Sequence, residues 1–376
     1  MSRKHKLWLS GAVGLALLII IGLFFQKPRI EPADPAQPPA MQVPAPAPFA
    51  AWPWPDARKE ALRRGVTHWF ARQPDGTTVD LLHFDFGANP GLRLELFDQD
   101  EDDEQPLDNV VDYEKRGVAQ VTRQLNARLK ANRSGHVVAA WNGLFFGYYH
   151  KEKAGLGFHV APVVLRGKVL YNRINRRWTF GVHYRNGKPV FRVLHLPNRA
   201  RLAEFDFAAA SAQCLIQDGK PLKVQPYPPT ASKRLKAPVP SLPHEAGHVP
   251  TFDHMLSSRV SWGWSHNHRH LYLLVVMDVD GEMASMLAFR HNQVGRGGWS
   301  VLDVQRFWRA MVRQNKVWNA VNSDAGGVAQ LAYRLPDGKY MLLPSNSQNR
   351  LVVAPDFKNA PRGGGIMFFY VRDIKD

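Results

Sequence analysis

Hydrophobic residues along this chain recur mostly at the short spacing of β-strands. Apolar runs of three to eight residues are separated by polar or turn-forming residues, a pattern typical of strands that bury at least one face. Asn-Gly and Asp-Gly pairs, which favour tight hairpin turns, divide several runs. Strands are predicted at 79–86, 92–97, 136–141, 163–165, 179–183, 190–194, 212–216, 259–264, 271–277 and 283–289, and turns at Asn186-Gly187, Asp218-Gly219, Asp280-Gly281 and Asp337-Gly338.

Three segments favour helices instead. Apolar residues recur at helical spacing within 113–131, and Ser300 and Asp303 have the spacing of a capping box before a second apolar stripe. A short helix is predicted at 56–64, ended by Gly65. The sequence therefore predicts an α+β fold, with few helices packed on antiparallel or mixed sheets.

The N-terminus carries a long apolar run. Residues 7–25, LWLSGAVGLALLIIIGLFF, contain no charged side chain, and a helix of that length just crosses a hydrocarbon core of about 30 Å. Basic residues within 1–6 precede it, which keeps that tail cytoplasmic. A cleaved signal peptide is the alternative, but the run is longer than usual for one and no A-x-A site follows directly. We expect a single-pass anchor in a bacterial inner membrane, with the rest periplasmic.

Beyond the anchor, the composition divides the chain once more. Residues 26–55 are rich in proline and alanine, which favours an extended linker. The remainder, 56–376, has the length and apolar content of one folded domain with a sizeable core. Cys214 is the only cysteine, so no intramolecular disulfide can form, and it is interpreted as a buried apolar residue.

The chain is strongly basic. Its formal net charge is +17, and residues 1–34 account for only three of these charges, so the exported part is itself basic. Such a field attracts anionic lipid surfaces, phosphorylated glycans or nucleic acid. Because the domain is expected outside the cytoplasm, we expect the first two partners and no nucleic acid.

Two histidine-rich segments raise the question of a metal. His244-Glu245-Ala246-Gly247-His248 matches the H-E-x-x-H zinc motif, which requires a helix, yet prolines precede and follow it. A zinc protease is therefore a minor hypothesis. His266, His268 and His270 alternate in a predicted hairpin turn, which offers no closed set of ligands. The acidic run at 98–104 is interpreted as a solvated loop, because it lacks the glycine and closing glutamate of an EF-hand. No cofactor is predicted, although a divalent cation is left open.

Five short motifs follow one another in a recognisable order: NGLFF at 142–146, FGV at 180–182, AQCLIQDGK at 212–220, SSRVSWG at 257–263 and AVNSDAGGV at 320–328. Together they resemble the phosphodiester glycosidase family, whose pattern is approximately N-G-G-F-F, F-G-I, A-x-x-L-I-x-D-G-K, S-A-R-T-A-I-G and A-x-N-L-D-G-G-G-S. This family includes the enzyme that uncovers mannose 6-phosphate. The resemblance extends over about residues 78–345.

The resemblance implies hydrolysis of the bond between a sugar's anomeric carbon and a phosphate oxygen, through an oxocarbenium-like transition state. Asp324 is the candidate general base or nucleophile, and Arg259 the clamp on the phosphate oxygens. Asn142 is the candidate positioning group and His183 a candidate general acid. Substrate-binding residues are expected at Gly143, Asn322, Gly326 and Gly327.

Each residue also has a purely structural interpretation. Arg259 can serve as an ion-pair partner, Asp324 as a turn residue, Asn142-Gly143 as a β-turn, and His183 as part of a strand face.

The motifs also depart from the family pattern. Leu144 and Ala325 replace glycines, and Val260 replaces a threonine. These changes either reshape the pocket or mark a loss of catalysis. The alternative to an enzyme is therefore a non-catalytic envelope module that binds anionic glycans.

Overall fold

The structure is a computed structural model. It describes residues 52–103, 106–108, 110–112, 116–143, 146–148, 156–159, 161–171, 178–195, 197–210, 213–223, 256–279, 297–325, 328–345 and 348–375. The chain divides into two compact units, 1–47 and 48–376, and all described residues belong to the second. The predicted cytoplasmic tail, the anchor at 7–25 and most of the linker lie outside them. Among the described residues, no helix has both the length and the apolar character needed to span a bilayer.

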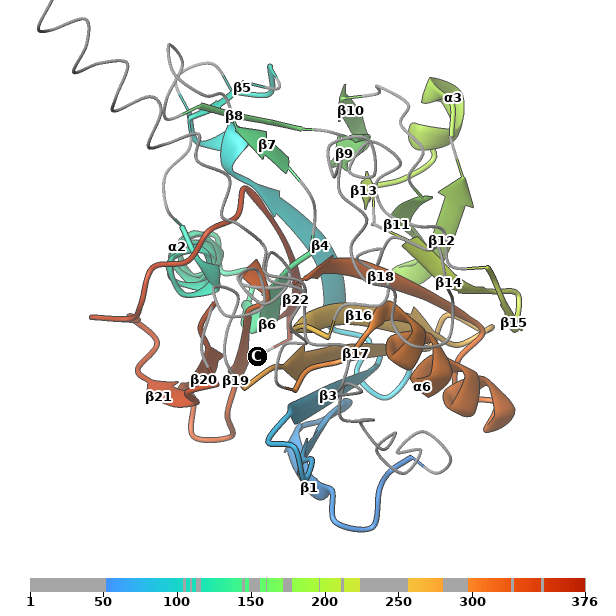
Figure 1. Ribbon diagram of the computed structural model, residues 1–376. Helices are drawn as coiled ribbons and strands as arrows, with labels where there is room; N and C mark the ends of the chain where they lie inside the picture. Colours follow the sequence, from blue (N-terminus) through green and yellow to red (C-terminus); the bar gives the residue numbers. More distant parts are fainter. Residues whose placement is uncertain are drawn as a thin grey trace, which may run out of the picture. The chain divides into compact units, whose positions relative to one another are not determined.

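The largest sheet has eight strands and combines segments from the whole described length of the chain (Figure 1). In spatial order they are β1 (Arg58–Arg63), β2 (Val66–Arg72), β3 (Thr78–Asp85), β17 (His270–Met277), β16 (Arg259–Trp264), β18 (Asn319–Ala325), β14 (Gln213–Gln217) and β15 (Lys220–Pro221).

Three smaller sheets complete the set. One has six strands, β21 (Leu351–Val353), β20 (Tyr340–Leu343), β19 (Leu331–Arg334), β6 (His136–Asn142), β22 (Met367–Asp373) and β4 (Leu92–Asp98). Another has five, β10 (Lys168–Tyr171), β9 (Val163–Leu165), β13 (Phe207–Ala210), β11 (Trp178–Arg185) and β12 (Lys188–His195). The last has three, β5 (Val110–Asp112), β8 (Leu156–His159) and β7 (Phe146–Tyr148).

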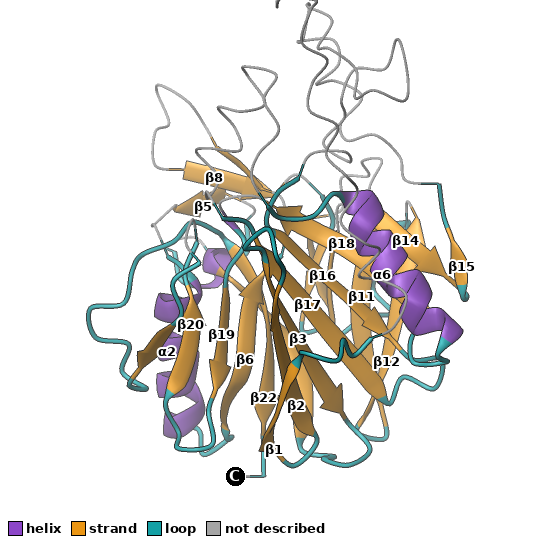
Figure 2. Cartoon of the chain, turned by 60° about the horizontal axis from the view of Figure 1, so that its bottom comes forward, coloured by secondary structure: helices purple, strands orange, loops and turns teal. Residues whose placement is uncertain are grey.

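Helices are few among the described residues: α2 (Val118–Ala131), α3 (Arg199–Leu202), α6 (Val301–Arg313) and the 3-10 turn η1 (Gln99–Glu101). Neighbouring strands in the described sheets pair antiparallel, as between β16 and β18 or β6 and β22. Figure 2 shows α2 along one side of the sheets and α6 along another. The prediction of mostly antiparallel sheets with few helices is thus confirmed.

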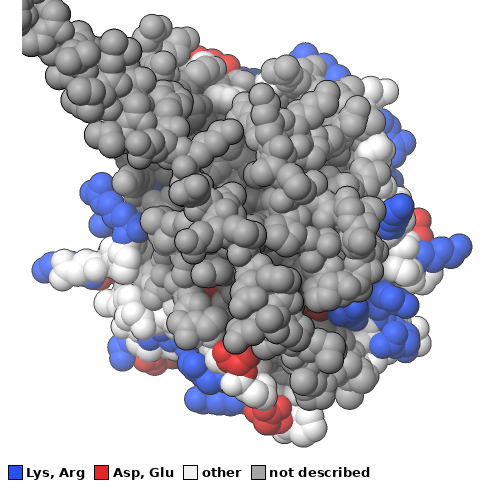
Figure 3. All heavy atoms as spheres, in the orientation of Figure 1, with Lys and Arg blue, Asp and Glu red and all other residues white. Residues whose placement is uncertain are grey.

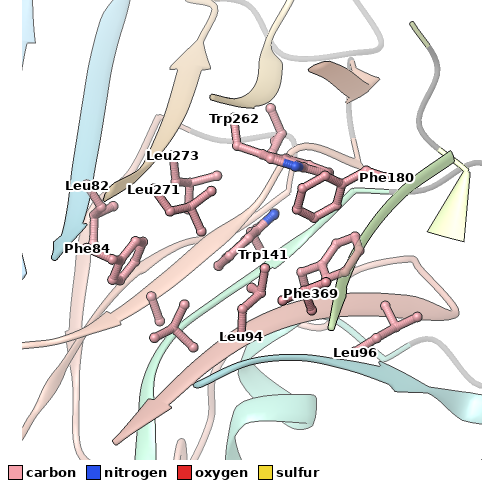
Figure 4. Packing of buried hydrophobic residues seen from close by; sticks show 14 of the residues in the cluster. Leu82, Phe84, Leu94, Leu96, Trp141, Phe180, Trp262, Leu271, Leu273 and Phe369 are labelled. Atoms are coloured by element: carbon pink, nitrogen blue, oxygen red, sulfur yellow. The ribbon is translucent and has the colours of Figure 1, made fainter. Parts of the chain in front are cut away.

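One aromatic cluster joins three sheets. Trp141 of β6 packs against Trp262 of β16 with ring centroids 6.1 Å apart, and against Phe369 of β22 at 6.2 Å. Phe180 of β11 lies 5.3 Å from Trp262 and 5.5 Å from Phe369 (Figure 4). All four side chains are fully buried. Each aromatic pair adds about 0.5–1.5 kcal/mol to its area burial, so this cluster is a main source of stability.

The helices cover the outer faces of the sheets. Phe307 and Trp308 of α6 are fully buried against the large sheet, and the Trp308 ring nitrogen donates to Ser261 Oγ at 2.7 Å. The capping box at the start of α6 is confirmed, since Asp303 N donates to Ser300 Oγ and Ser300 N donates to the Asp303 carboxylate. The helix predicted within 113–131 is α2, which begins at Val118.

A buried polar network ties strands β2 and β3 of the large sheet to β19. Arg350 donates to both oxygens of Asp80 at 2.8 Å, and His68 Nε2 lies 2.7 Å from the same carboxylate. Arg350 also donates to the Tyr333 hydroxyl at 2.9 Å. Burial alone raises the pKa of Asp80, but Arg350 and His68 more than offset it and lower that pKa. The carboxylate is therefore charged and satisfied, which a fully buried acid requires.

Two predictions about local structure are wrong. Residues 58–63 form strand β1, which pairs with β2 through a turn at Gly65 (φ 72°), so sheet pairing overrides the helical preference. The acidic run does not begin as a solvated loop, because Asp98 and Asp100 are fully buried. Asp98 lies 2.6 Å from the buried His159 Nε2, which compensates its burial.

The hairpin turns at Asn186-Gly187 and Asp218-Gly219 are confirmed, with positive φ at all four residues. The predicted strand 283–289 and the turn Asp280-Gly281 lie outside the described residues.

Truncating the centre of the aromatic cluster tests its importance. Replacing a buried aromatic residue by alanine removes its contacts and leaves a cavity, which typically costs about 3–5 kcal/mol. We therefore expect Trp262→Ala to lower the free energy of unfolding by about that amount, measured by urea denaturation followed by circular dichroism. An effect as small as that of Trp318→Ala, whose side chain is 37% exposed, would show that the cluster is not central.

Candidate functional site

Two of the sequence motifs meet where β16 begins and β18 ends. The two strands are antiparallel neighbours, with Arg259 opposite Ala325 and Ser261 opposite Asn322. The pairing is irregular between Arg259 and Ser261, so the end of β18 departs from a regular ladder there. Irregular pairing at a strand end re-aims side chains and is common beside functional sites.

The third motif reaches the same place from the facing sheet. Gly143 directly follows β6, and a methyl group at its Cα would lie 2.9 Å from Ser323 Oγ and 3.1 Å from the Trp262 ring. Only glycine permits this close approach without displacing a neighbour. The structure therefore brings the Asn142-Gly143 segment into contact with the Asn322-Ser323 segment.

Arg259 is held firmly at this end of the sheet. Its side chain is 4% exposed, and its Nε donates to the carbonyl of Trp299 at 2.8 Å. Val260 and Trp262 point into the aromatic core, so strand alternation places Arg259 on the opposite face, the one that α6 covers. A buried guanidinium fixed in this way is suited to bind an anion in a defined orientation.

Asn142 has a structural partner. Its Oδ1 accepts from Gln330 N at 2.8 Å, and its side chain is 2% exposed. Gln330 in turn accepts from Val118 N at 2.8 Å and donates to the Gly364 carbonyl at 3.0 Å. Asn142 thereby links β6 to the start of β19 and, through Gln330, to the first turn of α2. The amide oxygen is engaged, so any contact with a ligand falls to its NH2 group.

Asn322 and Ser323 contribute buried polar atoms. Asn322 is 2% exposed and Ser323 is fully buried, and the Asn322 amide donates to the Ser323 carbonyl at 3.0 Å. Within the described part of the chain, neither Asn322 Oδ1 nor Ser323 Oγ has a hydrogen-bond partner. Buried polar atoms are nearly always hydrogen-bonded, so these two atoms are candidates to bind a ligand or a water molecule. They lie on opposite faces of β18, because Asn322 is opposite Ser261 while Ser323 Oγ lies beside the Gly143 and Trp262 positions.

The backbone of Asp324 belongs to β18, but its side chain lies outside what the structure describes, as do Gly326 and Gly327. Their assigned roles stay predictions. Ser323 was not among the predicted site residues, although its place between Asn322 and Asp324 in the motif was the available signal.

His183 is not brought together with the other candidates. It lies on β11 opposite Val190 of β12, and the next residue of β12, Phe191, packs against His268 in the turn that follows Trp264, with ring centroids 6.3 Å apart. That turn is at the other end of β16 from Arg259, about 17 Å away at the rise of a strand. Burial, and then Arg192 and Arg185, lower the pKa of His183. The structure therefore gives no support to His183 as the acid at this site.

The histidines at 266, 268 and 270 lie where the sequence predicts them, in and beside the hairpin turn between β16 and β17. No group of three or more metal-binding side chains occurs among the described residues. The H-E-x-x-H segment at 244–248 lies outside them.

No protein-family model matches the chain, and no curated protein matches it. A hypothetical protein from Synechocystis matches with 13% identity and a TM-score of 0.42, over 85% of this chain and 64% of that one. A protein from Burkholderia pseudomallei, whose name proposes that it is exported, matches with 12% identity and a TM-score of 0.42, over 81% of this chain and 74% of its own. The chain thus spans less than two thirds of the first, and neither likeness carries an argument about function.

One histidine makes the stability of the fold depend on pH. His83 Nε2 lies 3.0 Å from His270 Nδ1, and its ring stacks on Tyr272 at 4.6 Å. Burial, and then His270, lower the pKa of His83 from 6.5 to about 4. The unfolded chain therefore takes up a proton below pH 6.5 that the folded chain refuses until about pH 4.

As the pH falls from 7 to 5, His83 becomes protonated in the unfolded chain and stays neutral in the folded chain. We expect this difference to reduce the free energy of unfolding by about 1–2 kcal/mol. His83→Gln keeps a polar group but cannot titrate, so the loss between these pH values should be smaller in this variant. Urea unfolding at the two pH values measures the difference. An identical loss in the variant and the wild type would contradict this role for His83.

Proposed function

We propose that the chain is a membrane-anchored, extracytoplasmic phosphodiester glycosidase that hydrolyses the bond between sugar C1 and phosphate in an envelope or extracellular glycan. One observation carries the proposal. Three segments far apart in sequence, around Asn142, Arg259 and Asn322, come together at one end of the facing sheets. They are the polar segments that the family resemblance selects.

In the proposed reaction, Arg259 binds the phosphate oxygens of the substrate and stabilises the charge that develops on them. The bond between the anomeric carbon and the phosphate oxygen breaks, and its electron pair leaves with the phosphate monoester. Asp324 either attacks the anomeric carbon, forming a glycosyl ester that water then hydrolyses to free the sugar and the carboxylate, or accepts the proton of a water that attacks this carbon directly. Phosphate is a good leaving group, so the reaction does not need His183 as an acid.

One departure from the family pattern falls on the inner face of the large sheet, which Gly143 and Ser323 also face. Val260 is fully buried and packs in the aromatic core, so the loss of a threonine hydroxyl there changes packing on the inner face of the sheet. It does not remove a polar group from the face that carries Arg259. The other two departures, Leu144 and Ala325, remain candidates for reshaping the pocket around a different sugar.

A non-catalytic glycan-binding module is the second candidate. It is favoured by the engagement of Asn142 Oδ1 and Arg259 Nε with backbone groups of the protein. Both groups then act first as structural links, and the same end of the sheets would bind an anionic glycan without cleaving it.

The proposal includes the arrangement of the whole chain. Residues 7–25 anchor it in the inner membrane, 26–55 form the linker, and 56–376 form one phosphodiester glycosidase-like domain of the α+β class in the periplasm. The apolar run and the preceding basic residues support this orientation. The partner is a phosphorylated glycan or sugar phosphodiester, and nucleic acid is not expected.

Turnover of sugar 1-phosphodiesters by the purified full-length protein tests the proposal. We expect Asp324→Asn to lower kcat by about 10²–10⁴, because it removes the base or nucleophile. Arg259→Lys should lower kcat by about 10²–10³, because the paired hydrogen bonds to phosphate are lost. Release of reducing sugar is the measurement, and thermal unfolding of each variant shows that it is folded.

Two matched controls sharpen this experiment. Asp337→Asn removes a carboxylate from an exposed turn, where the side chain is 53% exposed, and should leave kcat unchanged. His183→Ala should also keep most of the activity, since His183 lies at the other end of β16. Binding of the substrates without turnover by the folded wild type, unaffected by Asp324→Asn, would favour the non-catalytic module.

A further inference from the structure

A basic pocket lies at the opposite end of β6 from Asn142. Its volume is about 400 Å³, and it is formed by the last turns of α2, the start of β6 and the β19–β20 hairpin. Figure 2 shows α2 alongside these strands. Lys130, Arg133, His136 and Arg334 line it, together with Asn126 and Tyr340. At the rise of a strand, the length of β6 separates it from Asn142 by about 20 Å.

The pocket concentrates positive charge. Three of its lining residues are lysine or arginine and one is histidine, while none of those described as lining it is acidic. Lys130 and Arg133 are exposed, and neither has an ion-pair partner in the described ranges. A fourth cation, Arg63, contacts the His136 ring, and it also lies 3.7 Å from the Asp373 carboxylate. Lys130 and Arg133 are therefore the cations that the pocket presents most openly to an anion.

The floor of the pocket is rigid and polar. Tyr340 is 1% exposed, and its hydroxyl donates to the Val137 carbonyl at 2.6 Å and accepts from the Asn126 amide at 2.9 Å. Asn126 Oδ1 accepts from Val137 N at 2.9 Å, so the amide locks the end of α2 to β6. Arg133 follows the helix in a left-handed conformation (φ 49°), which fixes the direction of the chain at the rim. A preorganised floor lowers the entropy cost of binding.

The basic residues around this pocket are not explained simply as solvent-exposed charges on a basic protein. Basic residues in the last turn of α2 stabilise the negative end of the helix dipole. Among the residues that line the pocket, this explains the presence of Lys130 and no other. Arg334 and His136 come from two strands, and nothing in a helix dipole draws them to the same cavity. Figure 3 shows further Lys and Arg side chains along the rim of the face that it draws, several of them in groups.

We propose that this pocket binds the phosphate group of a sugar phosphate. Its volume lies within the range of small-molecule sites and exceeds what a bare phosphate fills, so a sugar ring fits beside the anion. Lys130, Arg133 and Arg334 contact the phosphate oxygens, and the walls of Leu129 and Pro355 face the sugar. The site is distinct from the proposed catalytic end and does not depend on it. A glycan with repeated phosphates would be held at two points.

Calorimetric titration of glucose 1-phosphate into the full-length protein in detergent tests this site. We expect saturable binding, weakened at least tenfold in the double variant Lys130→Gln/Arg133→Gln. The matched control Arg123→Gln/Arg309→Gln removes the same charge from exposed positions on α2 and α6 and should bind like the wild type. Arg259→Lys should also bind normally at this pocket, which separates it from the proposed active site.

The other outcomes are decisive as well. Equal weakening in the two double variants would mean that only the overall charge attracts the ligand, and it would overturn the proposal. Loss of binding in Arg259→Lys alone would place glucose 1-phosphate at the other end of β6. Glucose without phosphate should give no heat of binding, and inorganic phosphate should bind more weakly than glucose 1-phosphate. Tighter binding of bare phosphate would contradict a sugar phosphate site.

Discussion

The packing of Trp141 and Phe369 from one sheet against Trp262 from another sets the distance between these facing sheets. Sheets that pack face to face lie about 10 Å apart, and large aromatic rings fill that space without leaving sizeable voids. Trp262 also touches the position where a side chain on Gly143 would lie. The ends of β6, β16 and β18 therefore cannot shift separately. The packing of the core fixes the positions of the polar residues at these ends.

Buried hydrogen bonds also hold the sheets and helices together at the margins of the core. The Asp80 carboxylate, bound by Arg350 and His68, links strands β2 and β3 of the large sheet to β19. Gln330 links Asn142 to α2 and to the segment before β22. Such links are costly to break because each leaves a buried group unsatisfied. Asn142 and Arg259 belong to this class as well as to the candidate site. A residue with both functions is fixed before any ligand arrives, which preorganises the candidate site.

The sequence predicts those features that depend on neighbouring residues. The strands at 163–165 and 259–264, the Ser300 cap and the turns at Asn186-Gly187 and Asp218-Gly219 follow from local patterns and agree with the structure. Contacts between distant residues decided the rest. Residues 58–63 form a strand because β2 pairs with them. Asp98 can be buried because the His159 ring, 61 positions away in sequence, lies 2.6 Å from its carboxylate.

The candidate site shows the same division. The motifs selected Asn142, Arg259 and Asn322, and the structure brings the backbone segments that carry them together at one end of the sheets. His183 was selected on residue type within a strand, and no local pattern reveals which end of a neighbouring strand it faces. Nor does a sequence show that the cations of α2, β6 and β19 share one cavity, since that depends on how three elements dock.

A crystal structure of the protein with a sugar 1-phosphonate, a substrate analogue with an uncleavable C1 linkage, tests the central claim most directly. The account predicts the phosphonate within hydrogen-bond distance of Arg259, with the sugar beside Asn322 where β16 begins and β18 ends. An analogue bound only in the pocket of Lys130 and Arg133, with the strand ends around Asn322 unoccupied at saturating concentration, would contradict it.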